Sequence, residues 1–312
     1  MSLLLPEKQF NCAVGNNNNI VWNSDVVKAV VEMCLEHYLP KMKDTCLCVD
    51  FSNPGYISSW KKIHPEQKII FYNLEHKYPL DENNNPHNCS QEWNEFFKHT
   101  MPKLFDEIWD FNIENYEYFA SISMGDKFRF MPLRYTTWFE QFRKETTPRY
   151  DIEFEGLFTR IPRLKMIMML TCPVAVNQTQ SLRVKIANTP DPAVKYEEKQ
   201  DARYCIDYPQ YEQPETINST RIHECICLNR PVIVCDIYKV GSRKYWDDLC
   251  IYLEEPLTIN LWNLTRDEPR KDVAMVYKSR TYTDDAFQQY RKEIKEDFEK
   301  IKNIQIPDFV LQ

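Results

Sequence analysis

The sequence predicts an α/β protein of two consecutive domains, each built on a mostly parallel sheet with helices on both faces. Its 312 residues suit two domains of ordinary size. Short apolar runs alternate with segments of helical periodicity, as they do in βαβ units. A polar, charged stretch at residues 136–150 separates two such series, so we place the domains at 1–145 and 146–312. Two such domains imply a cleft between them, which is a preferred place for ligands.

Strands and helices alternate in the first domain. A helix at 24–39 begins at a capping residue, Ser24 or Asp25, and carries Val27 and Cys34 on one side. The continuous apolar run "TCLCVDF" indicates a buried strand. On the same grounds we expect strands at 10–15, 45–51, 68–76, 106–112 and 128–135, and further helices at 57–65 and 90–105.

The second domain repeats this alternation. A strand at 151–158 contains Gly156 and leads into a helix at 160–171, where Pro162 is tolerated in the first turn. A long amphipathic helix at 283–302 comes near the end of the sequence, and we expect it to pack back on the first domain. Between them we expect helices at 181–188 and 218–228 and strands at 204–209 and 230–237.

The composition indicates a soluble protein of a reducing compartment, and we expect it in the cytoplasm. A net charge of -7 argues against binding to nucleic acid through charge alone. The eleven cysteines include no CxxC pair, so we expect buried free thiols rather than a zinc site. No apolar run reaches the roughly 20 residues that span a bilayer, and the first ten residues lack the form of a signal peptide.

The stretch "RIHECICLNRPVIV", which begins at Arg221, carries the strongest indication of function. It places Arg221 and Glu224 on one face of a helix, directly before a buried strand. Asn218, Ser219 or Thr220 would cap this helix, whose free backbone amides and dipole favour phosphate groups. Arg221 could bind the same phosphates, and Glu224 could accept hydrogen bonds from ribose hydroxyls. The alternative is an Arg–Glu pair on a solvated helix surface, which contributes little to stability.

This stretch resembles the end of the donor-binding motif of group-1-type glycosyltransferases, which have the GT-B fold of two Rossmann-like domains. In that family a glutamate opens a segment of the form E-A-hydrophobic-small-x-G-x-P-V-hydrophobic, and Glu224 and Pro231 keep its spacing. The upstream "PETINSTR" resembles the L-E-T-x-R variant of the region and places Glu215 at an acidic position. Two departures are Thr216, where the commoner pattern is acidic, and Asn229–Arg230, which replaces a glycine-containing pair.

Other segments extend the resemblance over most of residues 68–298. "YDIEFEGLFTRIPRLKMIMML" resembles the first strand, glycine turn and helix of the family's C-terminal domain. "KIIFYNLEH", "FDEIWDFNIENYEYF" and "FMPLRY" resemble strands of its N-terminal domain. The resemblance implies a hexosyl- or pentosyltransferase that uses a nucleotide-sugar donor, without a metal or another cofactor. The acceptor would be a polysaccharide, a lipid, a protein or a modified nucleic acid.

The resemblance implies a donor site in the second domain. Glu224 would bind the ribose hydroxyls, and Glu215 would face the donor sugar or the diphosphate. Gly156 would let the backbone approach the donor closely. Cations, hydroxyls and amides would hold the diphosphate and stabilise it as it leaves, and they are Thr159, Arg160, Arg163, Ser219, Thr220 and Arg221. For the arginines at 160 and 163, a solvated helix start is the alternative.

The first domain would supply the acceptor side. "YNLEH" places Asn73, Glu75 and His76 at the carboxyl end of a strand, where open α/β sheets bind ligands. Glu75 or His76 could act as a general base if the reaction inverts configuration, and a loop cap and a surface histidine are the alternatives. Asp110 and Asn115 are weaker candidates of the same kind.

Motifs of several other enzyme classes do not occur in the sequence. It has no G-x-G-x-x-G, no G-x-x-x-x-G-K-[ST], no H-E-x-x-H and no G-x-S-x-G. It also has no D-x-D, the metal-binding signature of other sugar transferases. The few glycines and the altered motif leave two further functions open. One is a catalytically inactive GT-B-like binding or scaffold module, and the other is an epimerase that acts on the nucleotide sugar.

Overall fold

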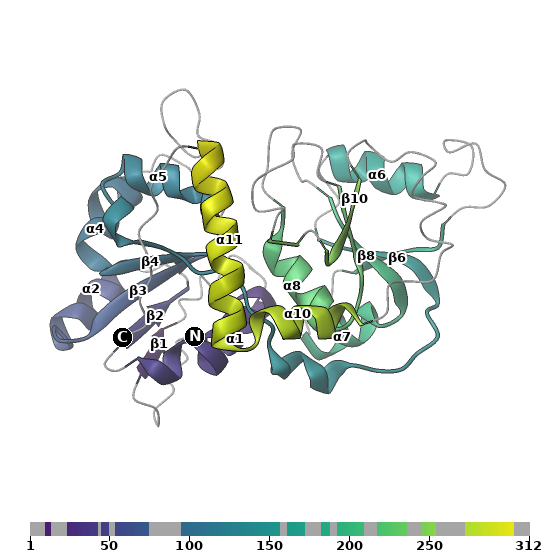
Figure 1. Cartoon of the computed structure of the whole chain (residues 1–312), viewed down its shortest axis with the longest axis horizontal. Coiled ribbons are helices and arrows are strands. Elements are labelled where there is room, and N and C mark those ends of the chain that lie inside the picture. Colours follow the sequence, from purple (N-terminus) through teal and green to yellow (C-terminus); the bar gives the residue numbers. More distant parts are fainter. Residues whose placement is uncertain are drawn as a thin grey trace. The chain divides into compact units, whose positions relative to one another are not determined.

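The computed structural model describes residues 10–13, 24–42, 45–49, 54–74, 95–156, 161–171, 182–187, 192–208, 217–235, 245–246, 248–253 and 272–302. The chain divides into two compact units (Figure 1). Unit 1 is Met1–Leu133 with Arg291–Gln312, and unit 2 is Arg134–Tyr290. Each unit contains a five-stranded sheet whose neighbouring strands are all parallel, which confirms the predicted α/β class.

Unit 1 has its strands in the order β1-β2-β3-β4-β5. The strands are β1 (Phe10–Ala13), β2 (Thr45–Cys48), β3 (Lys68–Asn73), β4 (Glu107–Asp110) and β5 (Phe128–Phe130). The helices are α1 (Ser24–His37), α2 (Pro54–Ile63), α4 (Met101–Leu104) and α5 (Tyr116–Ser121), with shorter turns at Leu39–Lys41, Phe96–Thr100, Ile113–Asn115 and Gly125–Lys127. The middle strands are buried along most of their length because both of their faces are covered, as expected for a parallel sheet.

One segment of unit 1 differs from the sequence resemblance. Only the first part of "FDEIWDFNIENYEYF" is a strand, and Ile113–Asn115 and Tyr116–Ser121 form helical turns. The aromatic side chains of this segment are buried in those turns, among them Tyr118 and Phe119. Their burial in a helix gives the same apolar run that a strand would show.

Unit 2 has its strands in the order β10-β9-β8-β6-β7. The strands are β6 (Tyr150–Glu155), β7 (Val184–Ala187), β8 (Ala202–Asp207), β9 (Val232–Cys235) and β10 (Cys250–Leu253). The helices are η5 (Thr137–Phe142), α6 (Ile161–Thr171), α7 (Pro192–Lys199), α8 (Ser219–Cys227), α10 (Val273–Thr281) and the start of α11 (Asp284–Lys302). The chain goes from β6 outward to β7 and then returns to the other side of β6, so the strand order reverses between β6 and β8.

The predicted helix at 181–188 is wrong. This segment contains β7, an edge strand that pairs in parallel with β6 through Ile152↔Val184 and Phe154↔Ile186. Val184 and Ile186 follow the period of two that a strand requires, and the segment is too short for a helical period to be distinguished. Helices α7 and α10 and strand β10 were not predicted.

Alternation along β6 and β8 gives the sheet of unit 2 one apolar face and one charged face. Ile152 and Phe154 of β6 join Tyr204 and Ile206 of β8 in the core beneath α6. Since successive side chains of a strand point to opposite faces, the intervening residues lie on the other face. These are Glu153, Glu155, Cys205 and Asp207, and the charged partners of the three carboxylates come from α7 and α8.

The units divide at positions other than the predicted 145/146. Arg134 begins unit 2, and its buried guanidinium donates to the backbone oxygens of Thr281 and Tyr282. At the other end, the division falls within α11. Arg291 of this helix donates from Nε to the Phe130 oxygen of unit 1, at 2.7 Å. The end of the C-terminal helix therefore packs with the first unit, as expected.

Two further expectations concern cysteines and membrane spans. All eight cysteines whose burial the structure describes are free and buried, which confirms the prediction for these eight. Within the described ranges, no helix combines the length and hydropathy that crossing a bilayer requires.

Candidate functional site

Helix α8 begins directly beside the carboxyl end of β8. Asn218 is its N-cap residue, because its side-chain oxygen accepts from the Arg221 backbone N–H at 3.1 Å and from the Thr220 hydroxyl at 2.7 Å. Asp207, the last residue of β8, accepts from the Asn218 backbone N–H at 2.9 Å. The expected cap is thus tied to the strand end, and the first turn of α8 lies at the edge of the sheet where ligands commonly bind.

Two guanidinium groups lie beside Gly156, at the carboxyl end of β6. Its φ of 128° is a conformation that L side chains rarely adopt. A Cβ at this position would lie 3.3 Å from Nη2 of Arg221 and 3.5 Å from Nη1 of Arg163. Both guanidiniums also lie near the Phe154 ring, with Cζ at 5.9 and 5.4 Å from its centroid. Three of the predicted donor residues, Gly156, Arg163 and Arg221, therefore come together at one point.

Arg221 and Glu224 do not form the surface pair that was the alternative interpretation. Arg221 makes an ion pair with Asp207, and Glu224 makes one with Lys195 at 2.9 Å. The Glu224 residue is only 1% exposed. Arg163 is only 6% exposed and donates from Nε to the Tyr208 oxygen at 3.2 Å, so it is not a solvated helix start.

A network of buried charges lies on the charged face of the sheet. Lys195 Nζ lies 2.9 Å from Oε1 of Glu155 and 2.9 Å from Oε2 of Glu224. Lys199 Nζ lies 2.5 Å from the other oxygen of Glu155 and 4.0 Å from Oε2 of Glu153. The carboxylates of β6 and α8 thus share the two ammonium groups of α7, a helix that the sequence resemblance did not include.

The carboxyl groups of this network titrate differently. Burial raises the pKa of Glu153 and of Glu224, and the charge of Lys195 opposes the rise at Glu224. Burial would raise the pKa of Glu155 too, but Lys199 and Lys195 hold it well below its usual range. Oε1 of Glu224 is buried and has no hydrogen-bond partner among the described residues. One oxygen of Glu224 is therefore fixed and the other is unsatisfied.

Sequence reasoning missed most of this network. Lys195 and Lys199 lie four residues apart on α7, which places them on one helix face, and Glu153 and Glu155 alternate in "DIEFE". Acidic residues at alternate positions of a buried strand, with a Lys-x-x-x-Lys helix nearby, were the pattern that could have indicated it. Polar residues in a buried strand need partners, and such partners come from the covering helix.

The backbone at Asn229 accounts for one departure from the family motif. Asn229 has a φ of 59° just after α8, and the next backbone N–H, that of Arg230, donates to the Cys225 oxygen at 2.8 Å. This is a helix end of the type that glycine usually occupies, and asparagine is the residue that most often replaces it. Asn229 therefore adopts the backbone conformation that glycine usually supplies at a helix end.

A buried polar cluster lies at the carboxyl ends of β3 and β4 in unit 1. Asp110 Oδ2 accepts from the side-chain amides of Asn73 at 2.7 Å and Asn115 at 2.9 Å, and its Oδ1 accepts from the Asn112 backbone N–H at 2.7 Å. Burial raises the pKa of Asp110 to about 8, although these donated hydrogen bonds lower it. The two weaker acceptor-side candidates, Asp110 and Asn115, thus contact each other.

The other predicted site residues fall into two groups. Ser219 and Thr220 lie in the first turn of α8 and are buried. Outside the described residues lie the predicted catalytic residues Glu75, His76 and Glu215 and the predicted donor residues Thr159 and Arg160. Thr216 lies outside them as well.

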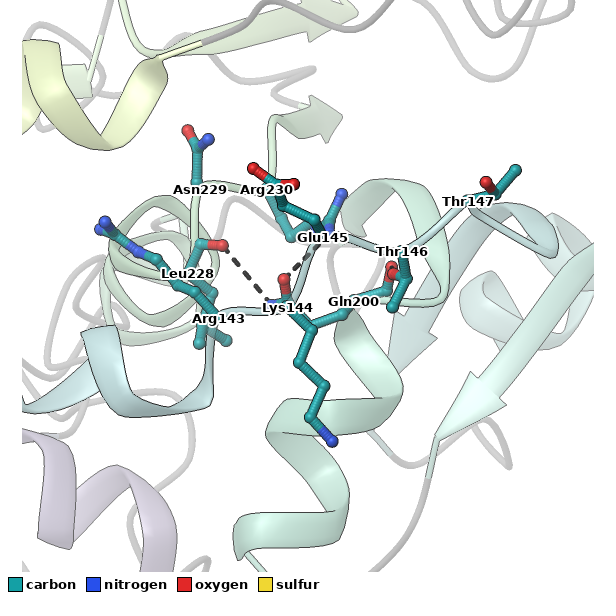
Figure 2. Close-up of a pocket in the computed structure, with 9 residues that line it drawn as sticks. All are labelled: Arg143, Lys144, Glu145, Thr146, Thr147, Gln200, Leu228, Asn229 and Arg230. Atoms are coloured by element: carbon teal, nitrogen blue, oxygen red, sulfur yellow. Dashed lines mark hydrogen bonds between the residues drawn. The ribbon is translucent and has the colours of Figure 1, made fainter.

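A pocket of about 610 Å³ lies at the amino ends of the strands of unit 2, away from Gly156 and Asp207 (Figure 2). It is lined by residues that precede β6, β8 and β9, namely Arg143, Lys144, Glu145, Thr146, Thr147, Gln200, Leu228, Asn229 and Arg230. Gln200 links its two sides, since it donates to the Leu228 oxygen and accepts from Arg230. None of the predicted donor residues with a described position lines this pocket.

No group of three or more His, Cys, Asp or Glu side chains that could hold a metal ion occurs in the described part of the chain. At the carboxyl ends of β6 and β8 lie instead the guanidinium groups of Arg163 and Arg221, beside the first turn of α8. Such groups bind anions, and phosphate in particular.

Comparison with known proteins gives structural similarities only. No family model and no curated protein matches the sequence. The structure is similar to Anabaena HepE in complex with UDP-glucose, with 9% identity, a TM-score of 0.48, and coverage of 87% of this chain and 82% of HepE. It is also similar to TarM, with 11% identity, a TM-score of 0.45, and coverage of 86% and 57%. The glycotransferase of kitacinnamycin has 10% identity, a TM-score of 0.37, and coverage of 91% and 83%.

Proposed function

We propose that the chain is a glycosyltransferase that transfers a sugar from a nucleotide-sugar donor bound by unit 2. In this proposal the diphosphate lies between Gly156 and the first turn of α8, where Arg163 and Arg221 hold it. Glu224 accepts hydrogen bonds from the ribose hydroxyls. The motif that contains Glu224 and Pro231 supports this function through its resemblance to group-1-type glycosyltransferases.

The observation that carries the proposal is the position of Gly156 and its two arginines. We number the five strands of unit 2 by their order in the chain, from β6 as first to β10 as fifth. Across the sheet from β7 they then lie in the order 2-1-3-4-5, which is one of the two common doubly wound orders. In such sheets ligands bind outside the carboxyl ends of the strands at the point where the order reverses. Here that point lies between β6 and β8, which end at Gly156 and Asp207.

The chemistry of these groups suits a departing diphosphate. Negative charge grows on the leaving group as the bond to the sugar breaks, and fixed cations and amides at that place lower the barrier. Arg221 is oriented by its ion pair with Asp207, and the Asn218 cap fixes the first turn of α8. We propose that these groups act without a metal ion, so nucleotide binding should persist in the presence of EDTA. Because Glu224 is buried, its contact with a ribose requires the residues that cover it to rearrange.

The proposal is tested by the melting temperature of the protein with UDP or GDP at millimolar concentration. A ligand that binds only the folded state raises the melting temperature. We expect one of the two nucleotides to raise it for the wild type, and Glu224→Gln to remove most of the rise. Radiolabelled nucleotide sugars should then show transfer or slow hydrolysis of the sugar.

A matched control is Glu197→Gln, which removes a half-exposed carboxylate of α7 that pairs with Lys144. It should leave the nucleotide effect unchanged. If neither nucleotide stabilises the wild type, the proposed function is wrong. If a nucleotide binds but no sugar is released or transferred from any nucleotide sugar, the chain is an inactive binding module instead.

A further inference from the structure

Lys195 pairs with two carboxylates. One is that of Glu224, which we assign to the ribose, and the other is that of Glu155, at the end of β6. Its Nζ lies 2.9 Å from Glu224 and 2.9 Å from Glu155, which directly precedes Gly156. The side chain of Lys195 is only 2% exposed, and that of Glu224 only 1%. Glu155 is held a second time, by Lys199 at 2.5 Å. Lys195 therefore has little freedom to release either carboxylate.

We propose that Lys195 is a positioning residue that fixes Glu224 for the ribose and so makes the site prefer ribonucleotides to 2′-deoxyribonucleotides. It binds Oε2 of Glu224 and leaves Oε1 to accept a hydrogen bond from the ribose 2′-hydroxyl. This inference rests on the proposed function, because it requires Glu224 to face a ribose. It adds a residue of α7 that does not itself touch the nucleotide.

Two observations support this role. Oε1 of Glu224 is buried and has no hydrogen-bond partner within the described ranges, whereas Oε2 is held by Lys195. A buried acceptor without a partner is costly, and a ribose hydroxyl would satisfy it. Burial raises the pKa of Glu224 and Lys195 opposes this rise, so the lysine also favours the ionised carboxylate, which is the better acceptor.

The experiment compares the affinities of UDP and 2′-deoxy-UDP, or of GDP and 2′-deoxy-GDP if GDP binds more tightly, by isothermal titration calorimetry. A hydrogen bond between a hydroxyl and a carboxylate corresponds to about tenfold in affinity. We expect the wild type to prefer the ribonucleotide by about that factor. In Lys195→Met this preference should fall to about twofold or less, with the deoxyribonucleotide affinity little changed.

The matched control is Lys185→Met, which removes another lysine that pairs with α7, through Glu198 at 3.1 Å. It should keep the preference of the wild type. A lysine that merely stabilised the fold would, on removal, weaken both nucleotides equally. Lys195→Arg keeps the positive charge and should retain more of the preference than Lys195→Met does.

If Lys195→Met does not fold, Lys195→Met/Glu155→Gln removes the cation together with one neighbouring negative charge and should show the same loss of preference. Retention of the full preference in a folded Lys195 variant without the charge would overturn the inference and leave the proposed function standing. A wild type that binds both nucleotides equally would also overturn it. A wild type that binds none of the four would overturn the proposed function, and the inference with it.

Discussion

Asp110 of unit 1 has surroundings that tightly restrict substitution. Its Oδ2 accepts from two side-chain amides and its Oδ1 from a backbone N–H, in a fully buried position. Asp110→Asn offers one oxygen and one NH2 group, so at least one buried donor loses its acceptor in either orientation. Each such loss costs about 1–3 kcal/mol. We expect urea unfolding to show a loss of stability in this range, whereas the exposed control Asp126→Asn should change it by no more than about 0.5 kcal/mol.

The same substitution should change how stability depends on pH. Burial raises the pKa of Asp110 to about 8, above the value of 3.8 for an ordinary aspartate. The folded state then binds this proton more tightly than the unfolded state. The group's contribution to stability is complete below pH 3.8 and is lost as the pH rises through about 8. The deficit of Asp110→Asn should therefore shrink between about pH 4 and about pH 8, and a deficit that grows would contradict the raised pKa.

At the scale of residues, the sequence predicted which side chains of unit 2 lie near one another better than it predicted their ion-pair partners. It indicated Gly156, Arg163 and Arg221, and the structure places them in contact distance. It did not indicate Asp207 or Lys195 as the partners of Arg221 and Glu224. The spacing within a helix gives the face that a residue shares, but the partner across the sheet depends on strand order, which no local pattern contains.

At the scale of elements, the start of α8 is where a local sequence rule and the candidate site coincide. Asn218 caps the helix by accepting from the Arg221 backbone N–H at 3.1 Å. Asn218→Ala removes this acceptor and should cost about 1 kcal/mol of stability in urea unfolding. Asn218→Asp keeps an acceptor at the cap and should restore most of the loss. An alanine variant as stable as the wild type would show that the cap contributes nothing here.

The elements that were predicted differ from those that were missed in the length of their pattern. Helices α1 and α11 carry an apolar stripe over several turns, and the predictions place both. Strand β7 has four residues, and a segment of that length fits a helix or a strand equally well. Helix α7 is short and has two buried lysines on its apolar side, so it lacks the apolar stripe that identifies a covering helix, and it was not predicted.

At the scale of the whole molecule, the fold class follows from the sequence and the division of the chain does not. Apolar strands alternate with amphipathic helices, and this pattern can be read from neighbouring residues. It predicts the two parallel sheets. The division depends instead on which unit each end of a connecting segment contacts. Arg134 bonds within unit 2, although it lies in a run that resembled a strand of the first domain. Tyr290 donates its hydroxyl to Tyr245 of unit 2, whereas the adjacent Arg291 bonds within unit 1.

Arg134 should therefore stabilise unit 2 more than unit 1. Its guanidinium donates to the Thr281 and Tyr282 oxygens at 2.7 Å each, and it pairs with Asp284 at 2.9 Å. Hydrogen bonds to a charged group contribute about 1.5–3 kcal/mol each, so losing two of them in Arg134→Met should destabilise unit 2 by at least about 3 kcal/mol. The half-exposed Asp284 adds little to this sum, because solvent screens its charge.

Hydrogen exchange measured for individual amides distinguishes the two units. In Arg134→Met the amides of α10 and of β8 should exchange faster, whereas those of β3 in unit 1 should keep their rates. Arg149→Met, which removes an exposed arginine paired with Asp201, should leave both sets unchanged. Equal acceleration in α10 and β3 would contradict the prediction, because it would mean that the two units unfold as one cooperative body and that Arg134 stabilises the whole chain.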